Sequence, residues 1–117
     1  MLAIRCGARK VYAVDVETVV VRTRKVISSN GLSDVVTVIG GDLLSMRTLP
    51  CVVVDVIIFD WRGRSVLDEH LLKCLYHARE MFLRGDGCGM IFPDILEVSL
   101  CGIESTALHK EKVSGTL

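Results

Sequence analysis

Apolar and polar residues follow two different periods along this chain. Three short runs rich in Val and Ile predict β-strands, at residues 10–14, 35–39 and 52–59. In the third run Asp55 is the only polar residue, and such a continuous apolar run predicts a strand buried on both faces of a parallel sheet. The runs are separated by stretches with helical spacing, so strands and helices are expected to alternate.

Two stretches carry the helical spacing. The first is residues 17–30, with apolar residues at 19, 20, 26 and 27, and Gly31 follows as a helix stop. The second is residues 67–83, where one helical face collects Leu67, Leu71, Cys74, Leu75, Ala78 and Phe82. Further extended segments are predicted at 90–92 and, after Pro93, at 97–103. This order predicts an α/β fold with a doubly wound, mostly parallel sheet.

The length and charge balance narrow the class of protein. With 117 residues the chain forms one domain at most, and we expect it to occupy residues 1–104, with 105–117 a disordered polar tail. Fourteen basic and fourteen acidic residues give a formal net charge of zero, so neither nucleic acid nor an anionic membrane is an expected partner. The sequence shows no signal peptide or membrane span, and a soluble cytoplasmic or nuclear protein is expected.

The cysteines and histidines do not predict a metal site. Five cysteines without a CxxC pair fit neither a zinc site nor a disulfide framework, so reduced thiols in the core are expected. His70 and His77 are seven residues apart and share a helical face, but no third ligand follows at a suitable spacing. A solvated helix flank is the expected environment of these two side chains.

Two acids flank the loop that follows the third apolar run. Asp60 ends the run and Glu69 opens the second helical stretch, and ligands of open α/β sheets bind outside the carboxyl ends of the strands. Two acids on one loop suit a cationic substrate. Equally, Asp60 is a good turn residue and Glu69 favours the first turn of a helix, so a purely structural role for both stays open.

One expected part of a nucleotide-binding sheet is missing from these 117 residues. Such sheets open with a strand and a glycine-rich turn that approaches the ligand closely, and no such turn occurs here. Residues 1–7 resemble the end of the helix that would follow that turn. The sheet is therefore expected to begin at its second strand, and an unpaired edge beside 10–14 or 52–59 predicts self-association.

Several segments together resemble the cofactor domain of protein arginine methyltransferases. The resemblance covers about residues 3–105, in order and with few gaps. It is carried by GARKVYAVD at 7–15, VVTVI at 35–39 with Gly41 and Leu49-Pro50, VDVII at 54–58 through Asp60-Trp61-Arg62-Gly63 and Glu69 to LYHAR at 75–79, and IFPD at 91–94. It implies a Rossmann-like class I methyltransferase that transfers a methyl from S-adenosylmethionine to arginine side chains of proteins.

The resemblance also assigns roles in binding the cofactor. Asp15 matches the family acid that binds the ribose hydroxyls of S-adenosylmethionine, although a strand-end acid that caps the next helix is the structural alternative. Asp42 and Leu43 match the acid and backbone amide that hold the adenine. Leu44 stands where the family commonly has a glutamate, so only weak cofactor binding is expected of these residues.

In the family, two glutamates on one loop grip the substrate guanidinium. The second carries over as Glu69, and the first falls on Asp60, which is one methylene shorter. A displacement of more than about 1 Å costs roughly a hundredfold in rate if nothing compensates. The family loop continues as Met-Gly-Tyr, whereas this chain has Arg62-Gly63-Arg64, whose charges repel a guanidinium.

Three functions remain open on these residues. The first is an arginine methyltransferase, truncated and inactive on its own, that acts on an arginine-containing protein substrate. The second is a catalytically dead relative that binds or regulates an active methyltransferase partner. The third is another nucleotide-binding domain, such as a dehydrogenase, which is disfavoured because the Asp60–Glu69 loop and the FPD segment have no role in hydride transfer.

Overall fold

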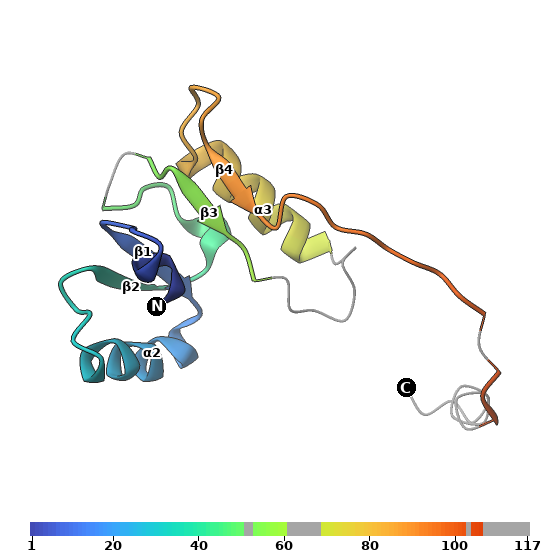
Figure 1. The fold of residues 1–117 in the computed structure, drawn as a ribbon, viewed down its shortest axis with the longest axis horizontal. Helices are drawn as coiled ribbons and strands as arrows, with labels where there is room; N and C mark the ends of the chain where they lie inside the picture. Colours follow the sequence, from blue (N-terminus) through green and yellow to red (C-terminus); the bar gives the residue numbers. More distant parts are fainter. Residues whose placement is uncertain (51–52, 61–68, 103, 107–117) are drawn as a thin grey trace.

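The computed structural model describes residues 1–50, 53–60, 69–102 and 104–106 (Figure 1). Helices and strands alternate along the chain after a short first helix. Their order is α1 (Leu2–Arg5), β1 (Val11–Asp15), α2 (Glu17–Ser29), β2 (Val36–Gly40), the 3-10 helix η1 (Leu43–Ser45), β3 (Val56–Ile58), α3 (Glu69–Phe82) and β4 (Met90–Phe92). The predicted alternation is confirmed, and the bounds differ from the expected ones by a few residues.

The strands form two parallel pairs, each part of one strand–helix–strand unit. β1 pairs with β2 from Val11↔Val36 to Asp15↔Gly40, and β3 pairs with β4 over three residue pairs. Within the described residues the two pairs are separate two-stranded sheets rather than one sheet. Both connections contain a helix, as parallel pairing requires.

The end of α2 shows why the sequence stops the helix there. The Leu32 N–H donates to the Ile27 carbonyl at 3.1 Å, and the Gly31 N–H donates to the Ser28 carbonyl at 3.0 Å. These two bonds form a Schellman motif, which needs a left-handed residue, and Gly31 has a φ of +66°. The predicted glycine stop is confirmed.

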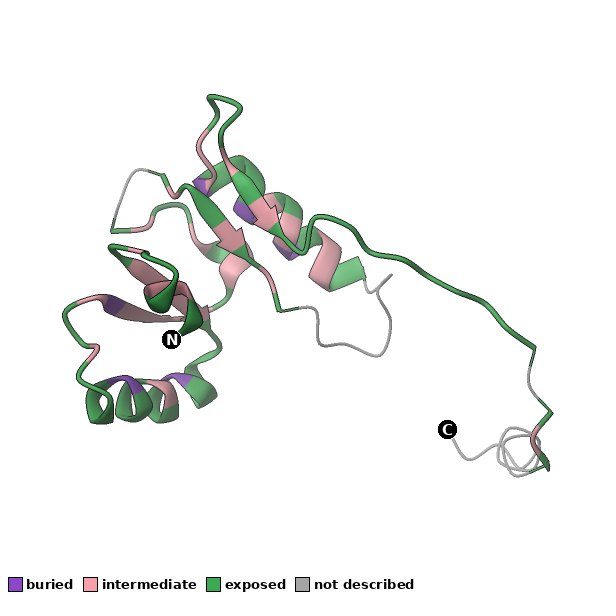
Figure 2. Cartoon of the chain, viewed as in Figure 1, coloured by how far each residue is buried: buried purple, intermediate pink, exposed green. Residues whose placement is uncertain are grey.

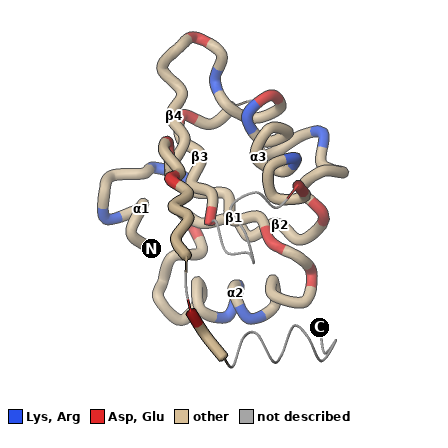
Figure 3. Tube along the Cα trace, turned by 90° about the vertical axis from the view of Figure 1, so that its right-hand side faces the viewer, with Lys and Arg blue, Asp and Glu red and all other residues tan. Residues whose placement is uncertain are grey.

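The core of the described residues is divided between the two units (Figure 2). In the first unit Val20 and Ile27 of α2 are buried, together with Val36 of β2. In the second, α3 runs along one side of β3 and β4 and buries the side chains of Cys74, Ala78 and Phe82 (Figures 1 and 3). Each core is a single helix face on a two-stranded sheet.

Two expectations about burial are wrong. The run 52–59 was expected to be buried on both faces, but Val56 is 37% exposed and Ile58 is 67% exposed. The reason is that α3 covers one face of the β3–β4 pair and no described element covers the other. Core thiols are expected for all five cysteines, and Cys74 is buried as expected, but Cys6, Cys88 and Cys101 are exposed because they lie outside the helix–sheet contacts. Cys51 lies outside the described residues.

Beyond β4 the chain leaves the two units. Residues 94–102 run as an extended arm away from them, and every residue of this arm is exposed (Figures 1 and 2). The expected strand at 97–103 therefore belongs to no sheet within the described residues. Most of the tail at 105–117, which is expected to be disordered, lies outside the described residues.

Among the described helices, none has the length and apolar composition of a membrane span.

Candidate functional site

The first group of predicted site residues lies at the carboxyl ends of β1 and β2. Asp15 ends β1 in register with Gly40, which ends β2. The Gly41 N–H then donates to the Asp15 carbonyl at 3.0 Å, with a φ of +138° at Gly41 that favours glycine. Asp42 follows directly, so both predicted cofactor acids, Asp15 and Asp42, belong to the same edge of the sheet.

Asp15 combines a local structural role with an available acceptor. Its Oδ1 accepts a hydrogen bond from the Val16 N–H at 2.8 Å, at the start of α2. Val16 is itself the N-cap of α2 and no side chain caps this helix, so the contact orients the Asp15 carboxylate but is not the helix cap that the structural alternative predicts. The side chain is exposed, and no described residue donates to Oδ2. One carboxylate oxygen therefore stays open for a hydroxyl donor while the other fixes the orientation of the group.

Glu17 also lies at this edge, a position that the sequence pattern did not predict. A Cβ at position 40 would lie 2.5 Å from the Glu17 Oε1 atom, so the carboxylate of Glu17 lies against the backbone of Gly40. The lack of a side chain at Gly40 permits this close approach. The signal in the sequence was a glycine closing the strand, with an acid two residues after Asp15.

Asp42 caps a turn with both of its carboxylate oxygens. Oδ1 accepts from the Leu44 N–H at 3.1 Å, and Oδ2 accepts from the Ser45 hydroxyl at 3.0 Å. Within the described residues the Leu43 N–H makes no hydrogen bond. The geometry therefore makes Asp42 the residue that shapes η1 and leaves the Leu43 amide as the open polar group of this turn.

His77 ties this turn to α3. Its Nε2 lies 2.8 Å from the Met46 carbonyl, which ends η1, and its ring meets Phe82 edge-on with centroids 5.9 Å apart. A solvated flank was expected for His77, but the ring is half-buried because it packs between the turn and the helix. The helix that begins with Glu69 is thus connected to the turn that holds Leu43.

Asp60 and Glu69 lie at the carboxyl edge of the second unit. The Phe59 N–H donates to the Phe92 carbonyl at 2.7 Å, which fixes the backbone just before Asp60. Glu69 is the first residue of α3, and its Oε1 pairs with the Lys73 ammonium at 2.6 Å. Both acids are exposed. The loop 61–68 between them, with Arg62 and Arg64, lies outside the described residues.

The Glu69–Lys73 pair matters for the proposed role of Glu69. Both side chains are more than half exposed, at 82% and 62%, and an exposed i,i+4 pair on a helix is worth only about 0.3–0.5 kcal/mol. A guanidinium with two parallel hydrogen bonds to a carboxylate is a stronger partner. Glu69 can therefore exchange Lys73 for a cationic ligand at small cost.

A charged cluster stabilises the opposite end of β3. The Arg84 guanidinium donates to Asp55 at 2.6 Å and to both oxygens of Asp86 (Figure 3 shows the charged positions). Hydrogen bonds from Arg84 hold the pKa of the Asp86 carboxyl below its usual range, and Asp86, then Asp55, raise the pKa of Arg84. The cluster joins the loop after α3 to the strand and is remote from the predicted acids.

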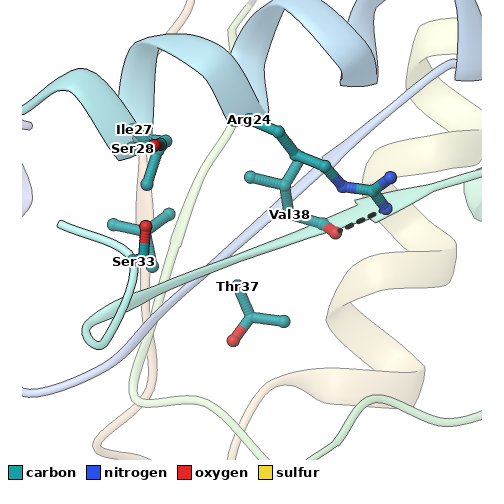
Figure 4. Close-up of a pocket in the computed structure, with 7 residues that line it drawn as sticks. Arg24, Ile27, Ser28, Ser33, Thr37 and Val38 are labelled. Atoms are coloured by element: carbon teal, nitrogen blue, oxygen red, sulfur yellow. Dashed lines mark hydrogen bonds between the residues drawn. The ribbon is translucent and has the colours of Figure 1, made fainter. Parts of the chain in front are cut away.

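The hollow of about 370 Å³ between α2 and β2 is a separate feature from these acids. Its lining includes Arg24, Ser28 and Ser33, near the start of β2 rather than its carboxyl end. Figure 4 shows the Arg24 guanidinium directed at the Val38 carbonyl, 3.4 Å away, and the two hydroxyls on the other side. These polar groups do not converge on a common point.

Metal chemistry has no candidate centre in the part of the chain that the structure describes. No group of three or more His, Cys, Asp or Glu side chains there could hold an ion. The candidate functional groups are exposed carboxylates at the carboxyl ends of parallel strands. Such acids accept hydrogen bonds from vicinal hydroxyls or from a cation.

The parallel strand–helix–strand units with acids at their carboxyl ends define a Rossmann-like domain of the class I methyltransferase type. The solved Trypanosoma brucei PRMT1 enzyme–prozyme heterotetrameric complex with AdoHcy is similar, with a TM-score of 0.64 and 37% sequence identity. The similarity covers 80% of this chain and 28% of that one. No protein-family model matches the chain.

Curated proteins of the same kind are also similar to this chain in sequence. Protein arginine N-methyltransferase 1 of Schizosaccharomyces pombe is 34% identical over 113 residues, which are 97% of this chain and 32% of that protein. Probable protein arginine N-methyltransferase 1.2 of Arabidopsis thaliana is 36% identical over 109 residues, covering 93% of this chain and 29% of that protein. This chain is a relative of the protein arginine N-methyltransferases, and it spans about a third of their length.

Proposed function

We propose that this chain supplies the cofactor edge and the acidic loop of a protein arginine N-methyltransferase. The observation that carries the proposal is the placement of Asp15, next to the Gly40–Gly41 turn, at the carboxyl end of a parallel strand in a relative of that family. The open Oδ2 of Asp15 suits a ribose hydroxyl. The Leu43 amide, held out by the Asp42 cap, suits an adenine nitrogen.

The residues fit S-adenosylmethionine only in part. When bound, this cofactor would supply an electrophilic methyl group on its sulfonium. Asp15 and the Leu43 amide offer a hydroxyl acceptor and a donor, but both oxygens of Asp42 are engaged by the turn and Leu44 has no polar group. We therefore expect weak binding to these 117 residues alone.

Asp60 and Glu69 provide the proposed grip on the substrate arginine. A guanidinium is protonated at any working pH and presents donors in a planar fork, so two carboxylates orient it and draw its positive charge towards themselves. The nitrogen that points away from them is then the better nucleophile. This work is orientation and electrostatic stabilisation, without a covalent intermediate on the protein.

A second candidate function follows from the length of Asp60. An aspartate in place of the family glutamate retracts one carboxylate by more than about 1 Å, which is enough to cost roughly a hundredfold in rate. A chain with that loss still serves as the inactive partner of an active methyltransferase. The similar T. brucei structure is itself an enzyme–prozyme complex.

Methyl transfer by a chimera tests the two candidates. Residues 1–106 replace the matching segment of the S. pombe relative, and radiolabelled cofactor reports transfer to an arginine-rich peptide. We expect low activity with the natural loop and higher activity after Asp60→Glu, Arg62→Met and Arg64→Tyr together. Glu69→Gln in the same chimera should return activity to background, because one acid cannot hold the fork.

The matched control is Glu80→Gln, at an exposed acid on the far half of α3, which should leave the raised activity unchanged. If the triple variant binds cofactor but its methyl transfer stays at background, the proposed grip by Asp60 and Glu69 is wrong. The role of an inactive partner is then favoured. If the natural loop already gives full activity, the shortened Asp60 has no consequence and that second role is excluded.

A further inference from the structure

The Glu17 carboxylate lies over the carboxyl end of the neighbouring strand β2. Glu17 is the first residue of α2, and the N-cap residue Val16 makes no side-chain hydrogen bond. A Cβ at position 40 would lie 2.5 Å from Oε1, 2.7 Å from Cδ and 2.8 Å from Oε2 of Glu17, so the whole group rests against the Gly40 backbone. Glu17 is exposed, and within the described residues its carboxylate makes no hydrogen bond or ion pair. Glu17 therefore holds an open acceptor at this edge.

Gly40 lacks a side chain at a position where the backbone does not require glycine. The described glycines with a positive φ do not include Gly40, which ends β2. A glycine inside a strand often marks a site where another group approaches the backbone closely. Here that group is the Glu17 carboxylate, because a Cβ at position 40 would meet it. The missing side chain thus makes room for the acceptor at the strand end.

Glu17 and Asp15 share one face of the sheet. Asp15 and Gly40 are register partners in the parallel pair of β1 and β2, and paired residues of neighbouring strands direct their side chains to the same face. Neighbouring strands are roughly 4.8 Å apart, so the two carboxylates lie over adjacent strand ends. The sugar and base of a nucleoside are joined directly. A nucleoside whose ribose binds Asp15 would therefore bring its base towards the end of β2.

The turn after β2 offers such a base a donor but no open acceptor of its own. Adenine presents an acceptor nitrogen beside its exocyclic amino group, so recognition of adenine takes a donor and an acceptor. The Leu43 N–H, which makes no hydrogen bond within the described residues, is the donor. Both carboxylate oxygens of Asp42 are engaged, and Leu44 has no polar group in its side chain. The acceptor must come from another element, and Glu17 has one.

We propose that Glu17 accepts a hydrogen bond from the exocyclic amino group of the cofactor adenine and sets the preference for that base. This role rests on the proposed function, because it requires that Asp15 binds the ribose of S-adenosylmethionine. An ionised acceptor forms a stronger hydrogen bond than a neutral one. An ionised carboxylate also has no proton to donate. Glu17 therefore favours a base with an amino group at this position over a base without one.

The test compares adenosine with purine riboside, which differs from it only by lacking the exocyclic amino group. The full 117-residue chain is titrated with each nucleoside at millimolar concentration, and nuclear magnetic resonance follows the Gly41 and Leu43 amides. The natural chain should bind adenosine roughly tenfold more tightly, as expected for a hydrogen bond to a charged group. Glu17→Ala should bind the two nucleosides equally. Glu17→Gln, which keeps a neutral acceptor, should show a preference between these two values.

Two control variants separate the role of Glu17 from the proposed function. Asp15→Ala should weaken the binding of both nucleosides and keep the preference for adenosine, because both contain the same ribose. Glu80→Ala, at an exposed acid on α3, should behave as the natural chain does.

The outcomes that contradict the proposal are distinct. If Asp15→Ala weakens binding but Glu17→Ala keeps the preference for adenosine, the role of Glu17 is wrong and the proposed function stands. If Asp15→Ala changes neither affinity, the proposed function is wrong and the role of Glu17 falls with it. A natural chain that shows no preference, or no shift of its amides with adenosine, also overturns the role of Glu17.

Discussion

His77→Phe tests the coupling between the cofactor turn and α3. The substitution keeps an aromatic ring next to Phe82 but removes the nitrogen that lies 2.8 Å from the Met46 carbonyl. The carbonyl at the end of η1 then loses its partner while the helix keeps its packing. We expect the turn that presents the Leu43 amide to loosen first.

The size of the effect follows from one half-buried hydrogen bond. Its net contribution is about 1 kcal/mol, and leaving the carbonyl unpaired adds to the loss when water cannot reach it. One kcal/mol corresponds to a fall of roughly 4 °C in melting temperature for a domain of about 100 residues. The opening of η1 should become about five-fold more frequent.

Amide hydrogen exchange measures this opening directly. The Ser45 and Met46 N–H groups donate to the Asp42 and Leu43 carbonyls at 3.1 Å, so their exchange reports the turn. His77→Phe should speed their exchange more than that of the α2 amides. His70→Phe, at an exposed position on the same helix, is the control and should leave the turn unchanged. Unchanged exchange at Ser45 and Met46 in His77→Phe would refute the coupling.

Three further outcomes are expected. Gly31→Ala should lower the free energy of unfolding by roughly 1 kcal/mol in a denaturant melt, because alanine resists the left-handed conformation, whereas Gly102→Ala in open space should have no effect. Because the pKa of Asp86 is lowered in the folded state, its ionised carboxylate stabilises the fold above the usual aspartate pKa of about 4, and this stability is lost as the pH falls through the lowered value. In a pH series of melts, Asp86→Asn should therefore lose less stability at acid pH than the natural chain does. Calorimetry should find weak or no binding of S-adenosylmethionine to the 117-residue chain alone, and submicromolar affinity would contradict this.

Local pattern was enough to predict α2, α3 and the first three strands, but the expected strand at 97–103 belongs to no sheet within the described residues. The 3.6-residue period and the glycine stop located α2, and the run before Asp60 located β3. The pattern could not predict which faces of a strand are covered by other elements. An apolar run looks the same whether one face or both are covered, so the exposure of Val56 and Ile58 came only from the structure.

The candidate site was predictable as positions and not as contacts. Asp15, Asp60 and Glu69 could be placed at carboxyl edges from the strand pattern alone. The Asp42 cap is a local contact to residues two and three positions on, but the His77 contact joins residues 31 apart in sequence and does not follow from local spacing. Long-range hydrogen bonds of this kind carry no periodic signal.

Calorimetry can measure how much Asp15 contributes to cofactor binding. In the chimera with the S. pombe relative, calorimetry with S-adenosylhomocysteine compares Asp15→Ala with Asp34→Ala, an exposed acid before β2. A hydrogen bond to a charged group is worth about 1.5–3 kcal/mol, so Asp15→Ala should weaken binding by roughly 10- to 100-fold. Asp34→Ala should bind as the parent chimera does. Equal affinity for the two variants would show that Asp15 does not bind the cofactor.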